Sequence, residues 1–478
     1  MTLAIVLIYL VVVTAIIIMT GRKVKTYYDF ALGSGSIPWI VICGSMFAST
    51  VGGATMIGYV GNYKAFGLQW AMLPLIDFFL ITMFIGLVVA PRLRKLNQYT
   101  TADMFRIRYG GKAKMVAAIL NVLGEFAVVV SMMSSFMTMV SGYLGFPATA
   151  SLIAAVIIFY ITATAGGLKG VAYTDLLQAC AIIVTVVIIV GICIGRSSGH
   201  MGEIPSNLFN PLASNMPWPT MSGNIISGAL MGFVSQSLLI QRINACKDSR
   251  SVKKAVIANA VGCGLFMIAG MGTIGILSNV LTPADVQGND VITALLSTMP
   301  TFVGALYCAA ILAAVLTTAN SLMLSTSMTF VRDIVGTVRP DLDDKQKIRT
   351  SRVFMLVEAL VAMILVRFFY SSVIGWIMIT YTVLATLMIP LYAGLLSKKV
   401  TPVSGFLGLA LGGGGAIIFE VAKLIGTLPE GLAQWHSIYI GIIGGIIGIL
   451  IGLASKNKST PQQEKVVECF MNNESYEE

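Results

Sequence analysis

The chain consists of long apolar runs separated by short polar segments. Most runs have about twenty residues, the length that an α-helix needs to cross the hydrocarbon core of a bilayer. They fall at residues 3–20, 38–60, 68–90, 115–142, 147–165, 172–195, 221–241, 255–278, 300–330, 352–369, 373–396, 403–424 and 435–454. The pattern predicts an all-α integral membrane protein with 13 transmembrane helices.

The composition agrees with a chain that lies in a lipid bilayer. It is 56% hydrophobic and only 11% charged, with a mean hydropathy of +0.87, whereas soluble proteins have about 25% charged residues. The net charge of +10 raises nucleic-acid binding as an alternative. The basic residues are scattered through short loops, however, so no nucleic-acid partner is expected.

The first apolar run is interpreted as a retained leading helix over residues 1–20. No basic residue precedes this run, and Arg22, Lys23 and Lys25 follow it. A cleaved signal peptide has its basic residues in the opposite order, before the apolar segment.

The distribution of Lys and Arg predicts the orientation in the membrane. With the N-terminus outside, 27 of the 31 basic residues fall on the cytoplasmic side or near it. Cytoplasmic loops carry such an excess in multi-pass proteins. We therefore expect a multi-pass plasma (inner) membrane protein with its N-terminus outside and its C-terminus in the cytoplasm. Residues 455–478 are polar and are expected to form a disordered cytoplasmic tail.

Two predicted spans are unusually rich in glycine. Span 38–60 contains Gly52 and Gly53 between polar neighbours, and span 221–241 contains Gly223, Gly228 and Gly232. The second is the fifth span after the first, and this odd offset means that the two run in opposite directions. Interrupted helices at corresponding positions of two halves indicate inverted repeats around a midplane binding site. The alternative is close helix packing through small residues.

A stripe of hydroxyl groups lies on the predicted span 300–330. Thr318, Ser321 and Ser325 follow one another at helical spacing, with Thr317 at the edge of the same face. Sodium prefers hard oxygen ligands, and a broken span 38–60 would present free backbone carbonyls at the same depth. The stripe therefore predicts a cation site between the two spans. The alternative is that each hydroxyl bonds back to its own helix.

Asp175 lies just inside the predicted span 172–195. A charged residue within a membrane is costly, and a cation or a polar partner is the usual reason for it. A second cation position between Asp175 and Ser321 is one interpretation. The other is that Asp175 caps the start of its helix, where the helix dipole favours an anion. The sequence leaves both open.

The remaining membrane-embedded acids are assigned to hydrogen bonds between helices. They are Asp77, Glu125, Glu358 and Glu420. The two histidines lie in or beside loops, which argues against a histidine-based metal centre. Sodium is the only cofactor predicted.

Three stretches of the chain together resemble the sodium/solute symporter family, which includes sodium/proline and sodium/glucose transporters. Residues 166–178 match its Gly-Gly…Thr-Asp…Gln signature, and residues 310–325 resemble its eighth core helix. Ile240-Gln241-Arg242 and Ala245-Cys246-Lys247 resemble the end of the family's sixth core helix. The count of 13 spans also agrees with this family.

The resemblance implies the leucine-transporter fold of five plus five inverted helices. The repeats would be residues 38–195 and 221–396, with a leading helix at 1–20, trailing helices at 403–454 and a tail at 455–478. It also implies a sodium site made by the backbone carbonyls of Ala48, Val51 and Ala314 and by the hydroxyls of Thr317 and Thr318. Asp175 matches an aspartate that helps to bind another sodium ion in some members.

The same resemblance bears on the solute. Gly232 stands where sugar-transporting members have a stacking tyrosine, which weakens the sugar interpretation. Phe233 and Gln236 resemble the corresponding pair of proline carriers. The predicted substrate residues are Thr50, Gly52, Phe233 and Gln236, and the expected solute is an amino acid such as proline or a small carboxylate.

The leading hypothesis is therefore a sodium-coupled symporter that imports a small organic solute by alternating access. A proton-coupled or sugar-type symporter of the same fold is the alternative. A membrane enzyme is disfavoured because no catalytic cluster is evident, and a sensor is disfavoured because the tail is too short for an output domain. The oligomeric state is left open.

Overall fold

The computed structural model describes residues 37–231, 237–369 and 372–477, together with residues 4, 11 and 15. The side chains at 165–167, 169 and 424 are not among those described. Within these ranges the chain is helical, apart from loops and one isolated β-bridge between Ile37 and Cys246. The predicted leading helix at 1–20 lies almost wholly outside the described residues.

The helices follow one another along the chain in three parts, where η denotes π-helical or 3-10 segments. The first part comprises α3 (Trp39–Thr50), η2 (Ala54–Tyr59), α4 (Val60–Phe66), α5 (Leu68–Pro74), η3 (Leu75–Thr82), η4 (Ile85–Val89), α6 (Ala90–Leu96), α7 (Thr101–Tyr109), α8 (Gly111–Met137), η5 (Thr138–Tyr143) and α9 (Ala148–Ser197). The next part comprises η6 (Met201–Glu203), η7 (Ser206–Phe209), α10 (Trp218–Met231), α11 (Ser237–Ala245), α12 (Ser249–Leu265), η8 (Phe266–Met271), α13 (Gly272–Leu281) and α14 (Asp290–Ser297). The last part comprises α15 (Thr301–Thr329), η9 (Phe330–Val335), α16 (Gly336–Val338), α17 (Asp344–Phe368), α18 (Val373–Leu396), α19 (Pro402–Leu424), α20 (Glu430–Ala433), α21 (Ile438–Leu453) and α22 (Pro461–Asn472).

The described helices confirm an all-α, membrane-spanning architecture. Seven of them are long and apolar enough to cross a bilayer, and the bent pair Trp39–Thr50 and Ala54–Phe66 makes an eighth candidate. Two shorter apolar helices, Ala148–Thr164 and Ile438–Leu453, lie where further spans are predicted. The full count of 13 spans is not confirmed and stays a prediction.

Helix α9 is not straight, because contacts beside both of its ends lie near the start of α15. Near its beginning, a Cβ atom on Gly304 of α15 would lie 2.2 Å from the hydroxyl of Tyr143. Near its end, the Arg196 side chain donates to the Thr298 carbonyl at 2.9 Å. A straight helix of 50 residues would be about 75 Å long. Element α9 therefore cannot be straight, and it covers both predicted spans, 147–165 and 172–195.

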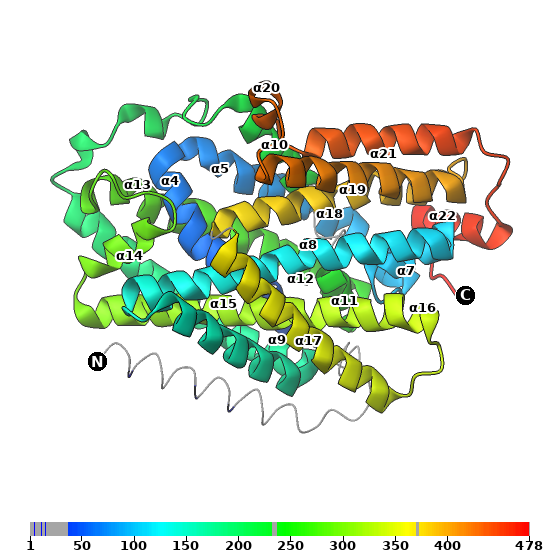
Figure 1. The fold of residues 1–478 in the computed structure, drawn as a ribbon, viewed down its shortest axis with the longest axis horizontal. Helices are drawn as coiled ribbons and strands as arrows, with labels where there is room; N and C mark the ends of the chain where they lie inside the picture. Colours follow the sequence, from blue (N-terminus) through cyan, green and yellow to red (C-terminus); the bar gives the residue numbers. More distant parts are fainter. Residues whose placement is uncertain are drawn as a thin grey trace.

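Helices α8 and α15 form the scaffold for the centre of the molecule. They run side by side along much of its length (Figure 1). Helix α15 also packs against α3 and α9, and most of its side chains are buried. An apolar helix that is buried all round lies in the core of a bundle. Polar groups on α15 therefore face other helices and must find partners there.

Helices α19 and α21 pack along one edge of the molecule through glycines (Figure 1). A Cβ atom on Gly448 would lie 2.4 Å from the Leu407 carbonyl oxygen, and one on Gly452 would lie 2.2 Å from the Ser404 Cα. These approaches require glycine, and small residues are common where membrane helices meet closely. The predicted trailing helices at 403–454 thus form a closely packed pair.

The expectation of a disordered tail over 455–478 is wrong. Thr460 caps α22, which is amphipathic and buries an apolar face that includes Val466, Val467 and Phe470. The side chain of Arg108 also donates to the Ser459 hydroxyl at 2.9 Å. The polar composition concealed these apolar positions, whose helical spacing gives the segment a face to bury.

Candidate functional site

The predicted break in span 38–60 is confirmed by the backbone. Helix α3 ends at Thr50, and Val51 leaves the helical conformation with φ −86° and ψ 73°. The chain then continues as η2, and the two helical parts are bent by 56° relative to each other. The last carbonyls of α3 therefore lose the N–H donors that a continuing helix would supply.

Several carbonyls near the end of α3 accept hydrogen bonds from residues close to the break, and one of them, that of Thr50, is freed by the break itself. The Val51 N–H donates to the Phe47 carbonyl at 2.8 Å. The Thr50 hydroxyl donates to the Met46 carbonyl at 2.8 Å, and the Thr55 hydroxyl donates to the Thr50 carbonyl at 3.2 Å. Backbone groups within a membrane must be satisfied inside the protein, so the break persists only because such donors exist.

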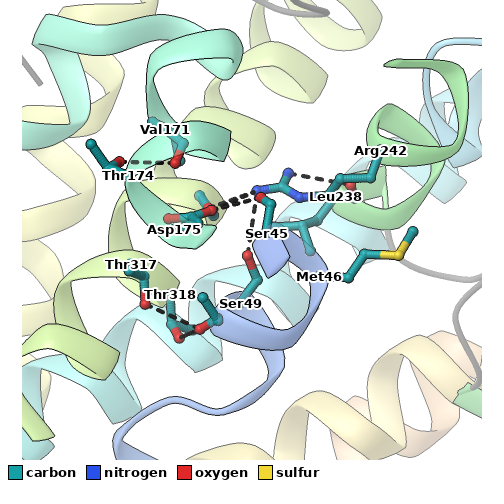
Figure 2. A network of polar contacts seen from close by, with 12 residues as sticks. Ser45, Met46, Ser49, Val171, Thr174, Asp175, Leu238, Arg242, Thr317 and Thr318 are labelled. Atoms are coloured by element: carbon teal, nitrogen blue, oxygen red, sulfur yellow. Dashed lines mark hydrogen bonds and ion pairs between the residues drawn. The ribbon is translucent and has the colours of Figure 1, made fainter. Parts of the chain in front are cut away.

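The carbonyl of Ala48 is satisfied by α15. The hydroxyls of Thr317 and Thr318 each donate to it at 3.1 Å. The Thr317 hydroxyl also lies 2.9 Å from the carbonyl of Ala314. Both threonines are 2% exposed, so these four oxygen atoms form a buried cluster between α3 and α15. Figure 2 shows the two threonines beside the end of α3. The alternative of hydroxyls bonded only to their own helix does not describe this pair.

Val51 and Gly52, the other two predicted site residues at the break, differ in their surroundings. Val51 is fully buried. A Cβ atom on Gly52 would lie 2.7 Å from the Thr318 hydroxyl oxygen and 3.0 Å from the Met132 sulfur. Only glycine allows the broken chain to approach Thr318 this closely. Gly52 thus faces the oxygen cluster, although it was predicted as a substrate residue.

Asp175 belongs to a separate polar network beside this cluster. Its carboxylate accepts a hydrogen bond from the Ser45 hydroxyl at 2.6 Å and lies 3.9 Å from the guanidinium of Arg242. The same guanidinium donates to Ser321 at 2.7 Å and to Ser49 at 3.3 Å. The network joins α3, α9, α11 and α15 (Figure 2).

The structure excludes Asp175 as a helix cap. It also shows that a positively charged side chain lies where a second cation was predicted. Asp175 is not a helix cap, because residues 170–174 directly before it are already helical. The gap between Asp175 and Ser321, where a second cation was predicted, is bridged by Arg242. Sodium binding there stays a prediction, and it would require the guanidinium to move.

Arg242 lies deeper in the protein than the sequence predicted. The distribution of basic residues placed it with a cytoplasmic loop, yet its side chain is fully buried. A buried charge needs a partner of opposite charge and hydrogen bonds to offset the cost of leaving water. Arg242 lies in a polar stretch that begins at Gln241. Nothing in this stretch indicated that the Arg242 side chain points into the protein.

Three of the four other embedded acids make the predicted contacts between helices. Glu358 accepts from the Thr326 hydroxyl at 2.9 Å, and Glu125 accepts from the Leu238 N–H at 3.0 Å. The Glu420 carboxylate accepts a short hydrogen bond from Ser437. Asp77 is the exception, because its buried carboxylate lines a cavity.

This central cavity has a volume of about 80 Å³ and lies at the break. Such a volume holds a few water molecules, so a solute would need side chains to move apart. The polar part of its wall comprises Ser49, Thr50, Thr55, Tyr59, Asp77, Thr380 and Tyr381. The apolar part includes Phe78, Val128, Met231, Leu238, Leu322 and Ile377. Among the described lining residues, Asp77 is the only carboxylic acid, and none is a lysine, an arginine or a histidine.

The predicted substrate residues divide into three groups. Thr50 lines the cavity, whereas Gly52 does not. Phe233 and Gln236 lie outside the described residues. Their described neighbours Met231 and Leu238 both line the cavity.

A second hollow lies beyond the break, on the side away from Arg242. It has a volume of about 500 Å³, and its wall includes Asn62, Thr138, Asp290 and Ser372. Gly58 also lines this hollow, and a Cβ atom on it would lie 3.1 Å from the Ile374 Cβ. The contact between η2 and α18 therefore lies in the wall of this hollow, next to Tyr59 in the wall of the central cavity.

Comparisons with known proteins agree with this arrangement. A family model described as "Sodium:solute symporter family" matches residues 30–412. The chain is 25% identical to the sodium/glucose cotransporter 1 of Sus scrofa over 94% of this chain and 78% of that protein. It is 24% identical to the sodium/pantothenate symporter of Escherichia coli (strain K12) over 93% of this chain and 94% of that protein.

The fold has a solved counterpart. A Na+-coupled sialic acid symporter in a substrate-bound outward-open state matches with a TM-score of 0.78, 17% sequence identity and coverage of 96% of this chain and 98% of that one. At this identity the likeness concerns the fold, and it agrees with the leucine-transporter-like arrangement expected from the sequence.

The oxygen cluster yields a direct prediction for Thr318→Val. Valine has nearly the same shape but lacks the hydroxyl, so sodium should bind roughly tenfold more weakly, given that hydrogen bonds to charged groups contribute about 1.5 kcal/mol or more. Thr318→Ser, which keeps the oxygen, should retain most of the affinity. Sodium-dependent thermal stabilisation of the purified protein measures both.

Thr185→Val is the matched control, because the Thr185 hydroxyl donates to the Ala181 carbonyl of its own helix. It removes the same group from another membrane helix and should leave the sodium response unchanged. Equal sodium responses for wild type and Thr318→Val would contradict the assignment.

Proposed function

This chain belongs to the sodium:solute symporter family, and from this premise we propose that it imports a small organic solute by alternating access, using sodium bound at the Ala48–Thr317–Thr318 cluster. Sodium is the coupling ion of such a transporter. One observation carries the proposal for the site. The Ala48 carbonyl, freed by a helix break, meets two threonine hydroxyls in a buried position.

The chemistry of the cluster suits sodium. Carbonyl and hydroxyl oxygens are hard ligands without a fixed charge, and the proposed set is completed by the carbonyls of Val51 and Ala314. A bound ion would take the place of the hydroxyl protons as the partner of the Ala48 carbonyl. The hydroxyls could then turn their lone pairs toward the ion, and the ion would tie the broken end of α3 to α15.

This link explains how ion binding could drive transport. One charge that crosses a potential of 100 mV releases about 2.3 kcal/mol. A sodium ion that fixes the end of α3 against α15 alters the balance between conformations by its difference in affinity for them. The Gly58–Ile374 contact lies in the wall of the larger hollow, close to the central cavity, which supports opening toward that hollow. Release to the other side would require the Arg242 network to separate.

The cavity lining favours a solute with N–H or O–H donors. Asp77 and the surrounding hydroxyls can accept such donors, and the described lining offers no basic side chain for a small carboxylate. We therefore propose an ammonium-bearing solute, such as an amino acid, whose carboxylate would accept hydrogen bonds from hydroxyl groups of the lining. A polyol is the second candidate, because hydroxyl groups would suit the same acceptors and one relative is named for glucose.

A thermal-shift screen of small solutes with and without sodium tests this function. Amino acids, amines, polyols and small carboxylates are compared on the purified protein. We expect a solute with donor groups to stabilise the protein more strongly when sodium is present, because the two binding events are linked. Stabilisation by a simple carboxylate alone would contradict the role of Asp77, and solute binding that ignores sodium would contradict the coupling.

Asp77→Asn separates the two solute candidates. It keeps the size and hydrogen-bonding capacity of the side chain but removes the charge, so an ammonium-bearing solute should bind at least roughly tenfold more weakly, while a polyol should lose much less. Sodium binding alone should be retained.

We further propose that Asp175 and Arg242 lie on the ion exit route. The guanidinium acts as a resident cation beside Asp175, and a departing sodium ion would displace it. The second sodium position between Asp175 and Ser321 would then be a transient stage of exit.

Asp175→Asn should impair the dependence of transport on sodium far more than the choice of solute. The amide keeps the hydrogen bond from Ser45 but cannot balance Arg242. Asp175→Ala should in addition lower stability by about 3 kcal/mol, because it leaves a buried charge unpaired. The readouts are the sodium concentration for half-maximal uptake and a competition profile of solutes. Asp341→Asn, in an exposed loop, is the control. An altered solute profile with normal sodium activation would refute the assignment.

A further inference from the structure

A third hollow lies on the membrane-facing side of α3 and is apolar throughout. It has a volume of about 520 Å³ and lies between α3, the second half of α9, and α12 with η8. None of its lining residues is charged. Small residues such as Ala179, Ala258, Gly262 and Ala269 leave the space unfilled. We call this hollow the α3–α9–α12 crevice.

The crevice opens toward the bilayer. Ile183, Val187 and Leu265 line it and are 42%, 66% and 56% exposed. They lie on segments that are apolar enough to cross a membrane. The medium around such side chains is the acyl chains of lipids. An unfilled apolar gap loses dispersion contacts along its whole wall, and an acyl chain that enters it restores them.

Basic residues continue the same face of α12 beyond the crevice. Residues four apart lie on one face of a helix, so Arg250 and Lys254 precede Ala258 and Gly262 along this face. Arg250 and Lys254 are exposed, in the first two turns of α12. Long basic side chains at the end of a membrane helix reach toward the interface and attract anionic lipids.

One further feature fits a lipid headgroup at this end. Tyr173 lies two turns before Cys180 on α9 and is 42% exposed, and exposed tyrosines are common at the level of the headgroups. Asp248 also lies here, but its carboxylate accepts the Ser251 N–H at 2.7 Å as the cap of α12. The Asp248 carboxylate thus binds the backbone at the start of α12, while Arg250 and Lys254 lie further along the helix.

We propose that the crevice binds one acyl chain of an anionic phospholipid, whose phosphate is held by Lys254 and Arg250. The inference goes beyond the proposed transport function and does not depend on the identity of the solute. The apolar wall selects the chain, and the basic end selects a negatively charged headgroup over a zwitterionic one.

The bound acyl chain would pack against the face of α3 that is opposite the proposed sodium site. Gly44 and Phe47 of α3 face the crevice, whereas their neighbours Ser45 and Ala48 bond to Asp175 and α15. A lipid packed against α3 stabilises the position in which the Ala48 carbonyl meets the two threonines. Anionic lipid should therefore raise the apparent affinity for sodium.

The test is a lipid titration of the purified, detergent-solubilised full chain with phosphatidylglycerol, phosphatidylcholine or glycerophosphoglycerol. Two readouts are followed: the thermal midpoint, and the rate at which a lipophilic maleimide labels Cys180, which is exposed and lines the crevice. We expect phosphatidylglycerol to raise the midpoint and slow the labelling at lower concentrations than phosphatidylcholine. The headgroup alone should do neither.

Three variants locate the site. Arg250→Gln with Lys254→Gln should weaken the phosphatidylglycerol effect by roughly fivefold for each charge removed. Lys345→Gln with Arg349→Gln removes the same charge from exposed positions at the start of α17 and should have no effect. Cys180→Phe fills the crevice from its open side and should abolish the thermal shift.

Two results would overturn the proposal. One is equal protection of Cys180 by phosphatidylglycerol and phosphatidylcholine together with no effect of the Arg250/Lys254 pair, which would indicate general lipid contact. The other is labelling of Cys180 that no lipid slows. Loss of sodium-dependent uptake would leave these binding readouts unaffected, so failure of the proposed function is distinguishable.

Discussion

The centre of the molecule depends on one requirement, that a backbone carbonyl freed inside a membrane must find a partner. The break after Thr50 removes the helical donor of the Ala48 carbonyl, and leaving such a group unsatisfied in a bilayer costs several kcal/mol. Helix α15 supplies two hydroxyls in its place. The break, the hydroxyl groups of α15 and the close approach at Gly52 thus all serve to satisfy this carbonyl. The same arrangement brings together hard oxygen atoms that are suited to bind an ion.

The buried charges add a second constraint beside the first. Arg242 and Asp175 offset each other only while four helices stay together. The hydroxyls of Ser45, Ser49 and Ser321 supply the remaining hydrogen bonds. Water that enters this region would make the separated charges much less costly. In the proposed alternating-access mechanism, the network would hold one side of the transporter closed and could open without a large penalty once water enters.

The features that could be predicted from the sequence are patterns of neighbouring residues. The features that were missed depend on how helices far apart in the sequence pack against each other. The apolar runs, the Gly52-Gly53 break and the Thr317–Thr318 pair are local patterns. The inward turn of Arg242, the exposure of Asp77 to the cavity and the docking of α22 through Phe470 arise from packing between elements far apart in the chain. For the same reason the sequence left two interpretations of Asp175 open, and the course of α9 excluded the helix cap. The family resemblance indicated where the ion should bind, but cavity chemistry required the three-dimensional arrangement.

The most direct test of the account is uptake of a solute found in the thermal-shift screen by proteoliposomes that hold the purified protein. An inward sodium gradient should drive accumulation of the solute above its external concentration, and collapse of that gradient with a sodium ionophore should abolish the accumulation. An equal proton gradient without sodium should not replace it. Accumulation that follows the proton gradient, or that is indifferent to sodium, would contradict the central claim that ion binding at the broken end of α3 powers transport.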